Sequence, residues 1–239
     1  MPGLAALFRE PSARLAADVL ASAGHWAPDL VVRDNTELGG WVVAHVLGVP
    51  LVVFGVVERL PPPTMRTFAR QLDELRAPYP ELTGADAAST YGDLYLEPTP
   101  PALLTSAPAP GQLLIRPAVE VSDGAQAPEW LRQLGDRRVV YLTLGTVLHR
   151  KRRLLEVLLE ALATEDVDVV FTYGAQEQLS GLPANVQAAP YIPQGLILPL
   201  CSAVLCHAGR GSVMGALAHG VPLVLAPMAA DQPGTAAAC

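Results

Sequence analysis

203-AVLCHAGRGSVMGALAHGVPLVLAPMAADQ-232 carries the strongest structural signal in this chain. An apolar run ends at His207 and is followed by a turn that contains Gly209 and Gly211. Small and apolar residues continue to Gly220, which is placed to cap a helix, and the following Val-Pro prevents the helix from continuing. A second apolar run occupies residues 223–226. Neither run alternates with polar residues, as expected for parallel strands covered on both faces. The segment predicts a strand, a tight turn, a helix and a second strand.

The predicted turn has the chemistry of an anion site. Glycines at the start of a helix let the backbone approach a ligand closely, and the first helical amides and the helix dipole attract negative charge. His207 ends the first strand and Asp231-Gln232 follow the second, where open α/β sheets bind ligands. A phosphate or diphosphate is the expected ligand. A glycine turn that serves only tight packing is the alternative.

The same pattern occurs once in the first half of the chain. The apolar run 30–34 ends at Asp34, a helix is predicted next, and Gly48-Val49-Pro50 precedes the apolar run 51–55. Two such units, one in each half, predict an α/β fold with two Rossmann-like sheets. For Asp34, two roles fit the pattern: a functional carboxylate at a strand end, or a cap for the next helix.

Proline-rich sequence up to Pro128 separates the two halves, and a new strand is predicted at 139–143. We therefore expect one domain at 1–118 and another at 119–239. In the first, Pro11-Ser12 indicates a helix start, and residues 103–116 indicate further short strands.

These landmarks together resemble the donor-binding signature of the family 1 glycosyltransferases, in particular the bacterial enzymes that glycosylate antibiotics and other lipophilic natural products. The family pattern is His-Gly-Gly-x-Gly-Thr, a helix, Gly-Val-Pro, a strand and Asp-Gln. The matching positions are His207, Ala208, Gly209, Arg210, Gly211, Ser212, Gly220-Val221-Pro222 and Asp231-Gln232. Ala208 replaces a family glycine, Arg210 a small residue and Ser212 a threonine. Residues 137–146 and 184–194 match further family segments, so the resemblance extends across essentially the whole chain.

The resemblance implies the GT-B fold and a hexosyltransferase-type reaction. An acceptor hydroxyl would attack the anomeric carbon of a UDP- or dTDP-sugar, with inversion and without a metal or other cofactor. A nucleotide sugar and a small lipophilic acceptor are the expected partners. The implied donor-binding residues are Thr146, Tyr191, Ile192, Gln194, His207, Gly209, Gly211, Ser212, Asp231 and Gln232.

The resemblance also gives Asp34 a role, because a family aspartate at this point orients a catalytic histidine on an earlier loop. That loop and its histidine are absent from this sequence, and the sequence ends at Cys239, before the last helices of the family's donor domain. We therefore expect an incomplete N-terminal acceptor-side domain, a donor domain without its last helices, and impaired transfer by this chain.

Composition excludes several classes of protein. The chain has 239 residues, is 51% hydrophobic and has a net charge of −7, which argues against electrostatic binding to nucleic acid or acidic lipid. Three cysteines without metal spacing and no signal peptide indicate a reduced, cytoplasmic protein. The longest apolar run, 38–57, is divided at Gly48-Val49-Pro50, so no membrane span is expected.

Two other functions fit parts of the pattern. A dinucleotide-dependent oxidoreductase would use Gly209-x-Gly211 at the start of a helix and Asp231, about twenty residues on, as the ribose-binding acid. In that case the third glycine, Gly215, is one place late. A non-catalytic auxiliary or relic that only docks a partner is the third possibility. Preference for NAD, or partner binding without nucleotide affinity, would favour these alternatives.

Overall fold

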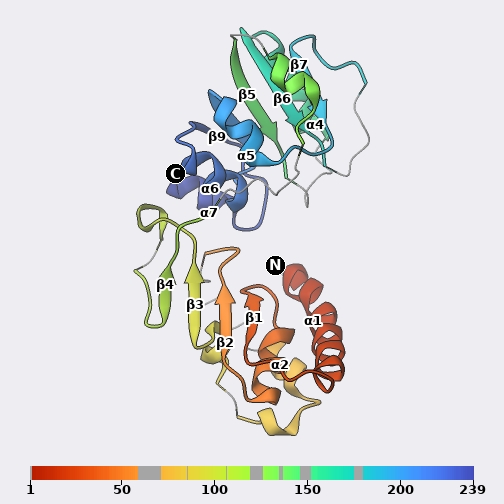
Figure 1. The fold of residues 1–239 in the computed structure, drawn as a ribbon, viewed down its shortest axis with the longest axis vertical. Helices are drawn as coiled ribbons and strands as arrows, with labels where there is room; N and C mark the ends of the chain where they lie inside the picture. Colours follow the sequence, from red (N-terminus) through yellow and green to blue (C-terminus); the bar gives the residue numbers. More distant parts are fainter. Residues whose placement is uncertain are drawn as a thin grey trace. The chain divides into compact units, whose positions relative to one another are not determined.

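The structure is a computed structural model that describes residues 2–58, 71–84, 86–105, 107–118, 126–134, 137–145, 152–174 and 180–239. The chain divides into two compact units, Met1–Arg116 and Pro117–Cys239. Each unit contains one sheet, and the strand pairs in both sheets are parallel (Figure 1). The α/β fold with two Rossmann-like sheets is therefore confirmed.

The first unit contains a four-stranded sheet in the order β1-β2-β3-β4. Its strands are β1 (Val31–Asp34), β2 (Leu51–Phe54), β3 (Leu94–Glu97) and β4 (Gln112–Leu114). Its helices are α1 (Pro2–Ala23) and α2 (Gly39–Leu47), with short 3-10 helices η1 (Pro80–Leu82), η2 (Ala87–Tyr91) and η3 (Pro101–Leu103). Residues 71–76 are also helical.

The core of this unit lies on one face of its sheet. Trp41 of α2 is fully buried in a cluster that includes Val53 of β2 and Tyr95 of β3. Successive strand side chains point to opposite faces, so the neighbours of these residues form the other face. On that face, Val32 and Phe54 are 63% and 37% exposed. The first sheet is therefore apolar on both faces but well covered on one.

The second unit contains a five-stranded sheet in the order β7-β6-β5-β8-β9. Its strands are β5 (Arg138–Thr143), β6 (Val167–Thr172), β7 (Val186–Ala189), β8 (Ala203–Cys206) and β9 (Leu223–Leu225). Its helices are α4 (Arg152–Ala163), α5 (Gln194–Ile197), α6 (Arg210–Ala218) and α7 (Gln232–Ala238), with 3-10 helices η4 (Glu129–Gln133) and η5 (Leu198–Leu200). The strand, turn, helix and strand predicted for residues 203–232 are all present.

Both faces of the central strands of the second sheet are covered. Consecutive residues Val204, Leu205 and Cys206 of β8 are buried, as are residues 169–172 of β6. Leu155 and Leu159 of α4 pack against one face. The expectation that the strands lack alternation because helices cover both faces is confirmed for β8, whereas Val224 of the edge strand β9 is 56% exposed.

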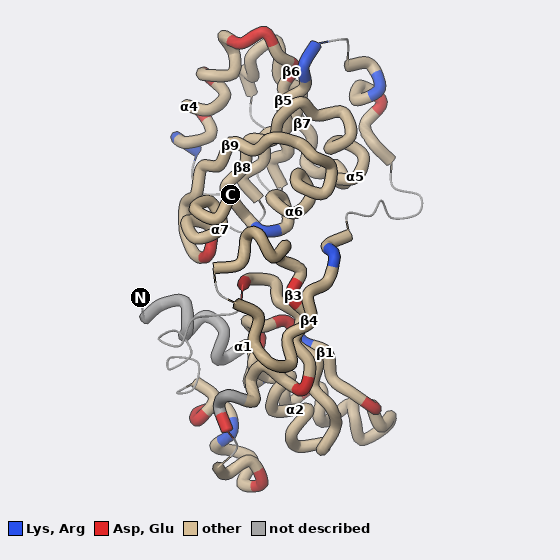
Figure 2. Tube along the Cα trace, turned by 90° about the vertical axis from the view of Figure 1, so that its left-hand side faces the viewer, with Lys and Arg blue, Asp and Glu red and all other residues tan. Residues whose placement is uncertain are grey.

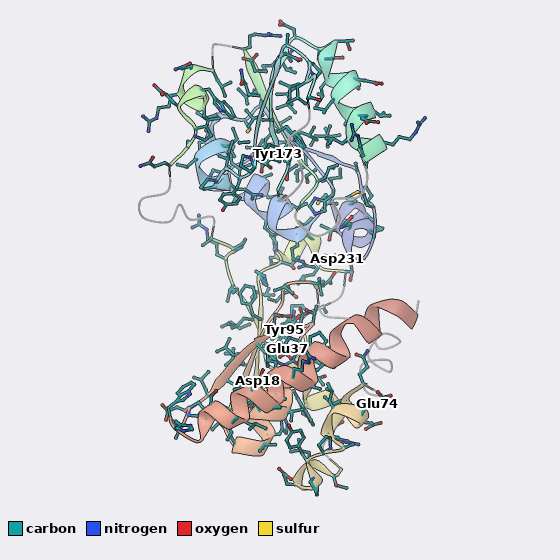
Figure 3. All side chains as sticks on the ribbon, turned by 90° about the vertical axis from the view of Figure 1, so that its right-hand side faces the viewer. Asp18, Glu37, Glu74, Tyr95, Tyr173 and Asp231 are labelled. Carbon is teal, nitrogen blue, oxygen red and sulfur yellow. The ribbon has the colours of Figure 1, made fainter. Side chains whose placement is uncertain are left out.

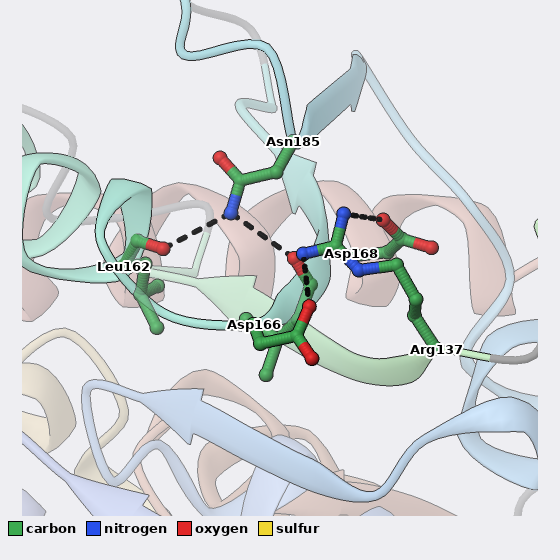
Figure 4. A network of polar contacts seen from close by, with 6 residues as sticks. Arg137, Leu162, Asp166, Asp168 and Asn185 are labelled. Atoms are coloured by element: carbon green, nitrogen blue, oxygen red, sulfur yellow. Dashed lines mark hydrogen bonds and ion pairs between the residues drawn. The ribbon is translucent and has the colours of Figure 1, made fainter.

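A polar network ties together the amino-terminal ends of the strands in this unit (Figure 4). Arg137, just before β5, pairs with Asp166 at 2.9 Å and with Asp168 of β6 at 3.4 Å. The Asn185 Nδ2 atom, just before β7, donates to the carbonyl oxygens of Leu162 and Val167, both at 3.0 Å. These contacts are structural, and they lie at the edge opposite the strand ends where a ligand is expected.

Two local predictions for the first unit were wrong. Pro11 lies inside α1, which begins at Pro2. Ser12, predicted to start the helix, instead accepts a hydrogen bond on its Oγ from the Leu38 amide at 3.2 Å. The second miss is β3, a strand that was not predicted; its last residue, Glu97, is a fully buried carboxylate that accepts a hydrogen bond from the Thr99 amide.

Among the described residues, no helix is long and apolar enough to cross a membrane. The apolar run 38–57 is shared between α2 and β2, and Gly48 separates them with a left-handed backbone (φ 66°). Acidic and basic residues are dispersed along both units (Figure 2).

Candidate functional site

The strand order of the second sheet identifies one place for a ligand. From β5 the chain moves outward through β6 and β7, then returns to add β8 and β9 on the other side of β5. Open α/β sheets bind ligands at such a reversal, outside the carboxyl ends of the two adjacent strands. Here those strands are β5 and β8, and their last residues Thr143 and Cys206 are paired in register. Gly145 and His207 therefore emerge side by side.

The imidazole of His207 lies between two glycines. A Cβ atom added to Gly145 would lie 2.6 Å from both Cε1 and Nε2 of His207, and one added to Gly209 would lie 2.6 Å from Cε1. Real Cβ atoms essentially never make contacts below 3.0 Å. Gly145 also has a left-handed backbone (φ 74°), which disfavours any side chain there. A side chain at either glycine would therefore require the ring to move from this position.

His207 is suited to act as an uncharged hydrogen-bonding group. Burial lowers its pKa from 6.5. A hydrogen bond to the Thr143 backbone and the negative charge of Asp231 act in the opposite direction. Its Nδ1 atom is buried and has no hydrogen-bond partner among the described residues. Buried polar atoms without partners are rare in native proteins, and one at a predicted ligand site is consistent with a missing ligand.

The start of α6 is open beside this ring. Gly209 precedes the helix and has no side chain to cap it. Gly211 is exposed, with open space around its Cβ position. Within the described part of the chain, no side chain occupies the amides of Gly211 and Ser212. Free amides at a helix start bind anions, so this end of α6 has the predicted chemistry.

Ala208 shows the effect of one departure from the family pattern. It is fully buried and has a left-handed backbone, with φ 62°. The pattern that the sequence resembles has glycine here, and glycine adopts this conformation without the steric cost that a Cβ atom brings. The replacement therefore keeps the geometry of the turn at some cost in stability.

The segment before α6 contributes a second side chain to the site. The Gln194 Nε2 atom at the start of α5 donates to Ser212 Oγ at 3.4 Å. Tyr191 is 72% exposed, so its ring is free to contact a ligand, whereas Ile192 is 1% exposed and belongs to the core. The structure thus brings Gln194 and Ser212 together. Of the other two predicted residues, only the Tyr191 side chain is exposed to a ligand.

The two residues of the Asp-Gln pair lie differently. Asp231 precedes α7 (Figure 3), and its carboxylate is close enough to His207 to affect the pKa of the imidazole. Gln232 is buried, and its Oε1 atom accepts hydrogen bonds from the amides of Met228 at 2.8 Å and Ala229 at 3.0 Å. Gln232 therefore holds the loop after β9. Thr146, also predicted for this site, lies outside the described residues.

Asp34, predicted to be functional, lies in the first unit at the end of β1. Its Oδ1 atom accepts hydrogen bonds from the amides of Thr36 at 2.7 Å and Glu37 at 3.1 Å, and from the Thr36 hydroxyl. These contacts hold the turn before α2, whose N-cap is Leu38 without a side-chain cap, so Asp34 does not cap the next helix as the second alternative expected. An orienting role toward a histidine stays a prediction.

Two buried polar residues of the strands were not singled out from the sequence. The buried Arg33 donates to the carbonyl oxygens of Asp34 at 2.8 Å, Glu37 and Thr90. Burial lowers the pKa of Arg33 to about 10. In the second unit, Tyr141 lies buried in β5 with its hydroxyl 2.9 Å from Thr172 Oγ1. The available signal was an arginine or tyrosine within an otherwise apolar strand, because such a side chain needs a buried partner.

Comparison with known proteins agrees with this geometry. The family model for the N-terminal domain of erythromycin biosynthesis protein CIII-like proteins matches residues 3–145, and the model for their C-terminal domain matches residues 156–239. An aclacinomycin-T 2-deoxy-L-fucose transferase from Streptomyces galilaeus is 34% identical over 90% of this chain and 52% of its own length. A 4'-demethylrebeccamycin synthase from Lentzea aerocolonigenes is 31% identical over 94% of this chain and 63% of its own length. The chain thus spans between half and two thirds of these relatives.

Solved structures show the same fold. The glycosyltransferase VinC in complex with dTDP has a TM-score of 0.78 and 28% identity, over 98% of this chain and 64% of VinC. The spinosyn rhamnosyltransferase SpnG complexed with thymidine diphosphate has a TM-score of 0.77 and 26% identity, over 98% of this chain and 63% of SpnG. The oxidoreductase alternative finds no support in these comparisons. The chain belongs to the erythromycin biosynthesis protein CIII-like family of glycosyltransferases.

Proposed function

We propose that the second unit binds the diphosphate of a nucleotide sugar at the open end of α6, for transfer of the sugar to a hydroxyl of a lipophilic natural product with inversion. The arrangement of His207 between Gly145 and Gly209, beside free helical amides, is the observation that carries this proposal. Thymidine diphosphate is the favoured nucleotide, because VinC and SpnG have been solved with it.

The chemistry of the site suits a departing diphosphate. In a single displacement, negative charge develops on the leaving phosphate oxygens, and fixed donors stabilise it without reorganisation. The amides of Gly211 and Ser212 and the dipole of α6 supply such donors. The neutral ring of His207 adds one N–H, and Asp231 is placed to accept from a sugar hydroxyl. The proposal includes no metal, so a chelator is expected to leave nucleotide affinity unchanged.

The remaining parts of the proposal rest on the family. Asp34 would orient a base that takes the acceptor proton, and the first unit would contact the lipophilic acceptor. We propose a cytoplasmic location because all three cysteines are free thiols. The chain spans only part of its relatives, so transfer of the sugar is itself part of the proposal.

Calorimetric titration of the full chain with thymidine diphosphate and uridine diphosphate tests the proposal. We expect saturable binding of at least one diphosphate and a loss of about tenfold in affinity in His207→Ala, corresponding to one hydrogen bond to a charged group. His25→Ala is the matched control, because His25 is exposed and lies in the first unit. It should bind like the wild type.

Absence of diphosphate binding by a chain that circular dichroism shows to be folded would refute the proposal. Tighter binding of NAD than of either diphosphate would restore the oxidoreductase alternative. Binding of a partner protein without nucleotide affinity would support the auxiliary role.

A further inference from the structure

The first sheet presents an apolar surface on the face opposite its core. Strand register places six apolar side chains there, which together form the open face: Val32, Val52, Phe54, Leu94, Leu96 and Leu113. Val32 and Leu113 lie on the two edge strands and are 63% and 52% exposed, and Phe54 of the inner strand β2 is 37% exposed. The apolar surface therefore extends across all four strands.

The strand order explains why this face is left uncovered. In the first unit the strands are added in one direction, and right-handed connections between parallel strands then place every connecting helix on the same face. Ala16 of α1 and Trp41 of α2 accordingly lie in one buried cluster with Tyr95 of β3. In the second unit the direction reverses after β7, so its connections can cover both faces. The open face is therefore a consequence of the topology of the first unit.

We propose that the open face binds the open face of a second copy of this chain, in a two-fold symmetric dimer in which two sheets pack face to face. Parallel sheets are normally covered on both faces, and packing one apolar sheet face on another covers both at once. A two-fold axis brings one surface against an identical one, so an uncharged apolar face is complementary to itself.

The charges of the chain favour this occupant. Each chain has a net charge of −7, so two copies repel one another unless uncharged surfaces meet. Among the described residues of β1–β4, Asp34 is the one charged residue that alternates to the side of the open face, and it lies at the end of β1. Its carboxylate accepts hydrogen bonds within its own turn. Two copies can therefore meet at the open face without burying an unpaired charge at its centre.

The area of the open face predicts a weak dimer. Its six side chains, at their exposed fractions, present roughly 300–400 Å² of apolar surface per chain, the size at which a patch on a soluble protein is often functional. Two such patches, which supply about 65% of a homodimer interface, correspond to a total buried area of about 1,000–1,200 Å². That value is at the lower end for specific interfaces, so the dimer should form only at micromolar or higher concentrations.

The dimer does not depend on the proposed function. The open face belongs to the first unit, whereas the candidate donor site belongs to the second. In dilute solution the chain is monomeric and Phe54 is exposed as in the structure. Diphosphate affinity is expected to be the same for the monomer and the dimer.

Sedimentation equilibrium of the full chain, from about 1 to about 200 µM, tests the proposal. We expect the apparent mass to rise with concentration toward twice that of the monomer. Val32→Lys should raise the dimer dissociation constant about a hundredfold, because a two-fold interface contains each substitution twice and each buried charge costs at least about tenfold. Leu113→Lys, on the opposite edge strand, should act in the same way. Both side chains are exposed in the monomer, so circular dichroism should show an unchanged fold.

Val157→Lys is the matched control. Val157 lies on α4 in the second unit and is 52% exposed, like Leu113, and its replacement changes the net charge by the same amount. This variant should dimerise like the wild type.

Several outcomes would overturn the proposal. A wild-type chain that stays monomeric at the highest concentration would do so, as would a dimer that Val32→Lys and Leu113→Lys leave intact. Equal dissociation of the Val157→Lys variant would show an effect of net charge alone. A monomeric wild type that binds a synthetic amphipathic helix of leucine and lysine, with loss of binding in Val32→Lys, would assign the open face to a helix of another protein instead.

Discussion

The two units use the same strand, turn and helix for different purposes. In the first unit, α2 begins with Gly39-Gly40, and the carboxylate of Glu37 accepts hydrogen bonds from both glycine amides, with the Gly40 contact at 2.8 Å. In the second unit, α6 begins after Gly209, and within the described residues no carboxylate bonds to the amides of Gly211 and Ser212 in its first turn. The Glu37 carboxylate, an anion of the protein itself, bonds to the first amides of α2. The first turn of α6 can instead bind the anion of a ligand.

The sheets differ as well. A parallel sheet usually has both faces covered, as the central strands of the second sheet do. In the first sheet, Phe54 of the inner strand β2 remains 37% exposed, beside Val32 of the edge strand β1. The comparison shows that a repeated sequence pattern predicts an element but not its use. Whether a helix start can bind a ligand depends on whether neighbouring side chains already bond to its amides.

The largest expected effect is a loss of stability when a phenylalanine side chain is removed, compared between the two units. Phe171 of β6 is 1% exposed, and Phe54 lies on the open face of the first sheet. Phe171→Ala should lower the free energy of unfolding by about 3–5 kcal/mol, and Phe54→Ala by about 1 kcal/mol, because only the first leaves a cavity. Urea unfolding followed by circular dichroism measures both. Similar losses would show that the open face is covered in solution.

The next test removes the Glu37 carboxylate. Glu37→Ala leaves the Gly39 and Gly40 amides without their acceptor, so stability should fall by about 1–2 kcal/mol, the range found for helix caps. Thymidine diphosphate affinity should not change, since Glu37 and the donor site lie in different units. A loss of affinity equal to that of His207→Ala would contradict the separation of the two roles.

The pH dependence of stability tests the environment of His207. Its pKa is lowered on folding, so the unfolded chain takes up the proton first as the pH falls. Stability is therefore expected to decrease below about pH 6.5, the unperturbed pKa of histidine, and to continue decreasing until the pH passes the folded pKa. His207→Asn should remove this part of the slope. An unchanged slope would mean that the ring is as solvated in the folded chain as in the unfolded one.

The smallest effect concerns Ala208. Ala208→Gly should raise stability by about 0.5 kcal/mol, because relief of the left-handed conformation, about 1–2 kcal/mol, exceeds the entropic cost of glycine, about 0.5–1 kcal/mol. Ala216→Gly, at an equally buried position inside α6, should instead lower stability by about 1 kcal/mol. Equal losses at both positions would argue against strain at Ala208.

The sequence predicts most of this fold where apolar runs end at glycine or proline. Residues 203–232 and 30–55 have such boundaries, and their strands and helices occur where expected. The strand β3, which ends in a buried carboxylate, was not predicted. The predicted helix start at Pro11 was wrong, because the neighbouring Ser12 bonds to the amide of Leu38 instead. Local composition does not show which distant group a polar side chain will meet.

For the candidate site, the sequence predicts the residues better than their roles. The structure brings His207, Gly209, Ser212 and Gln194 together at the switch point of the sheet. Gln232 illustrates the limit, because its carboxamide oxygen bonds to two backbone amides of its own loop. Whether a polar group faces the ligand or the backbone depends on loop geometry, which motif spacing does not specify.

The ring of His207, held between Gly145 and Gly209, has a consequence for engineering and for divergence. A side chain at either glycine would displace the ring, and a smaller residue at 207 would leave a gap between two bare backbones. The two glycines come from loops more than sixty residues apart in the sequence. A chimaera that takes only one of these loops from a relative with a different arrangement will therefore carry a mismatched site. Donor specificity should be transferable only when the loops after β5 and β8 are exchanged together.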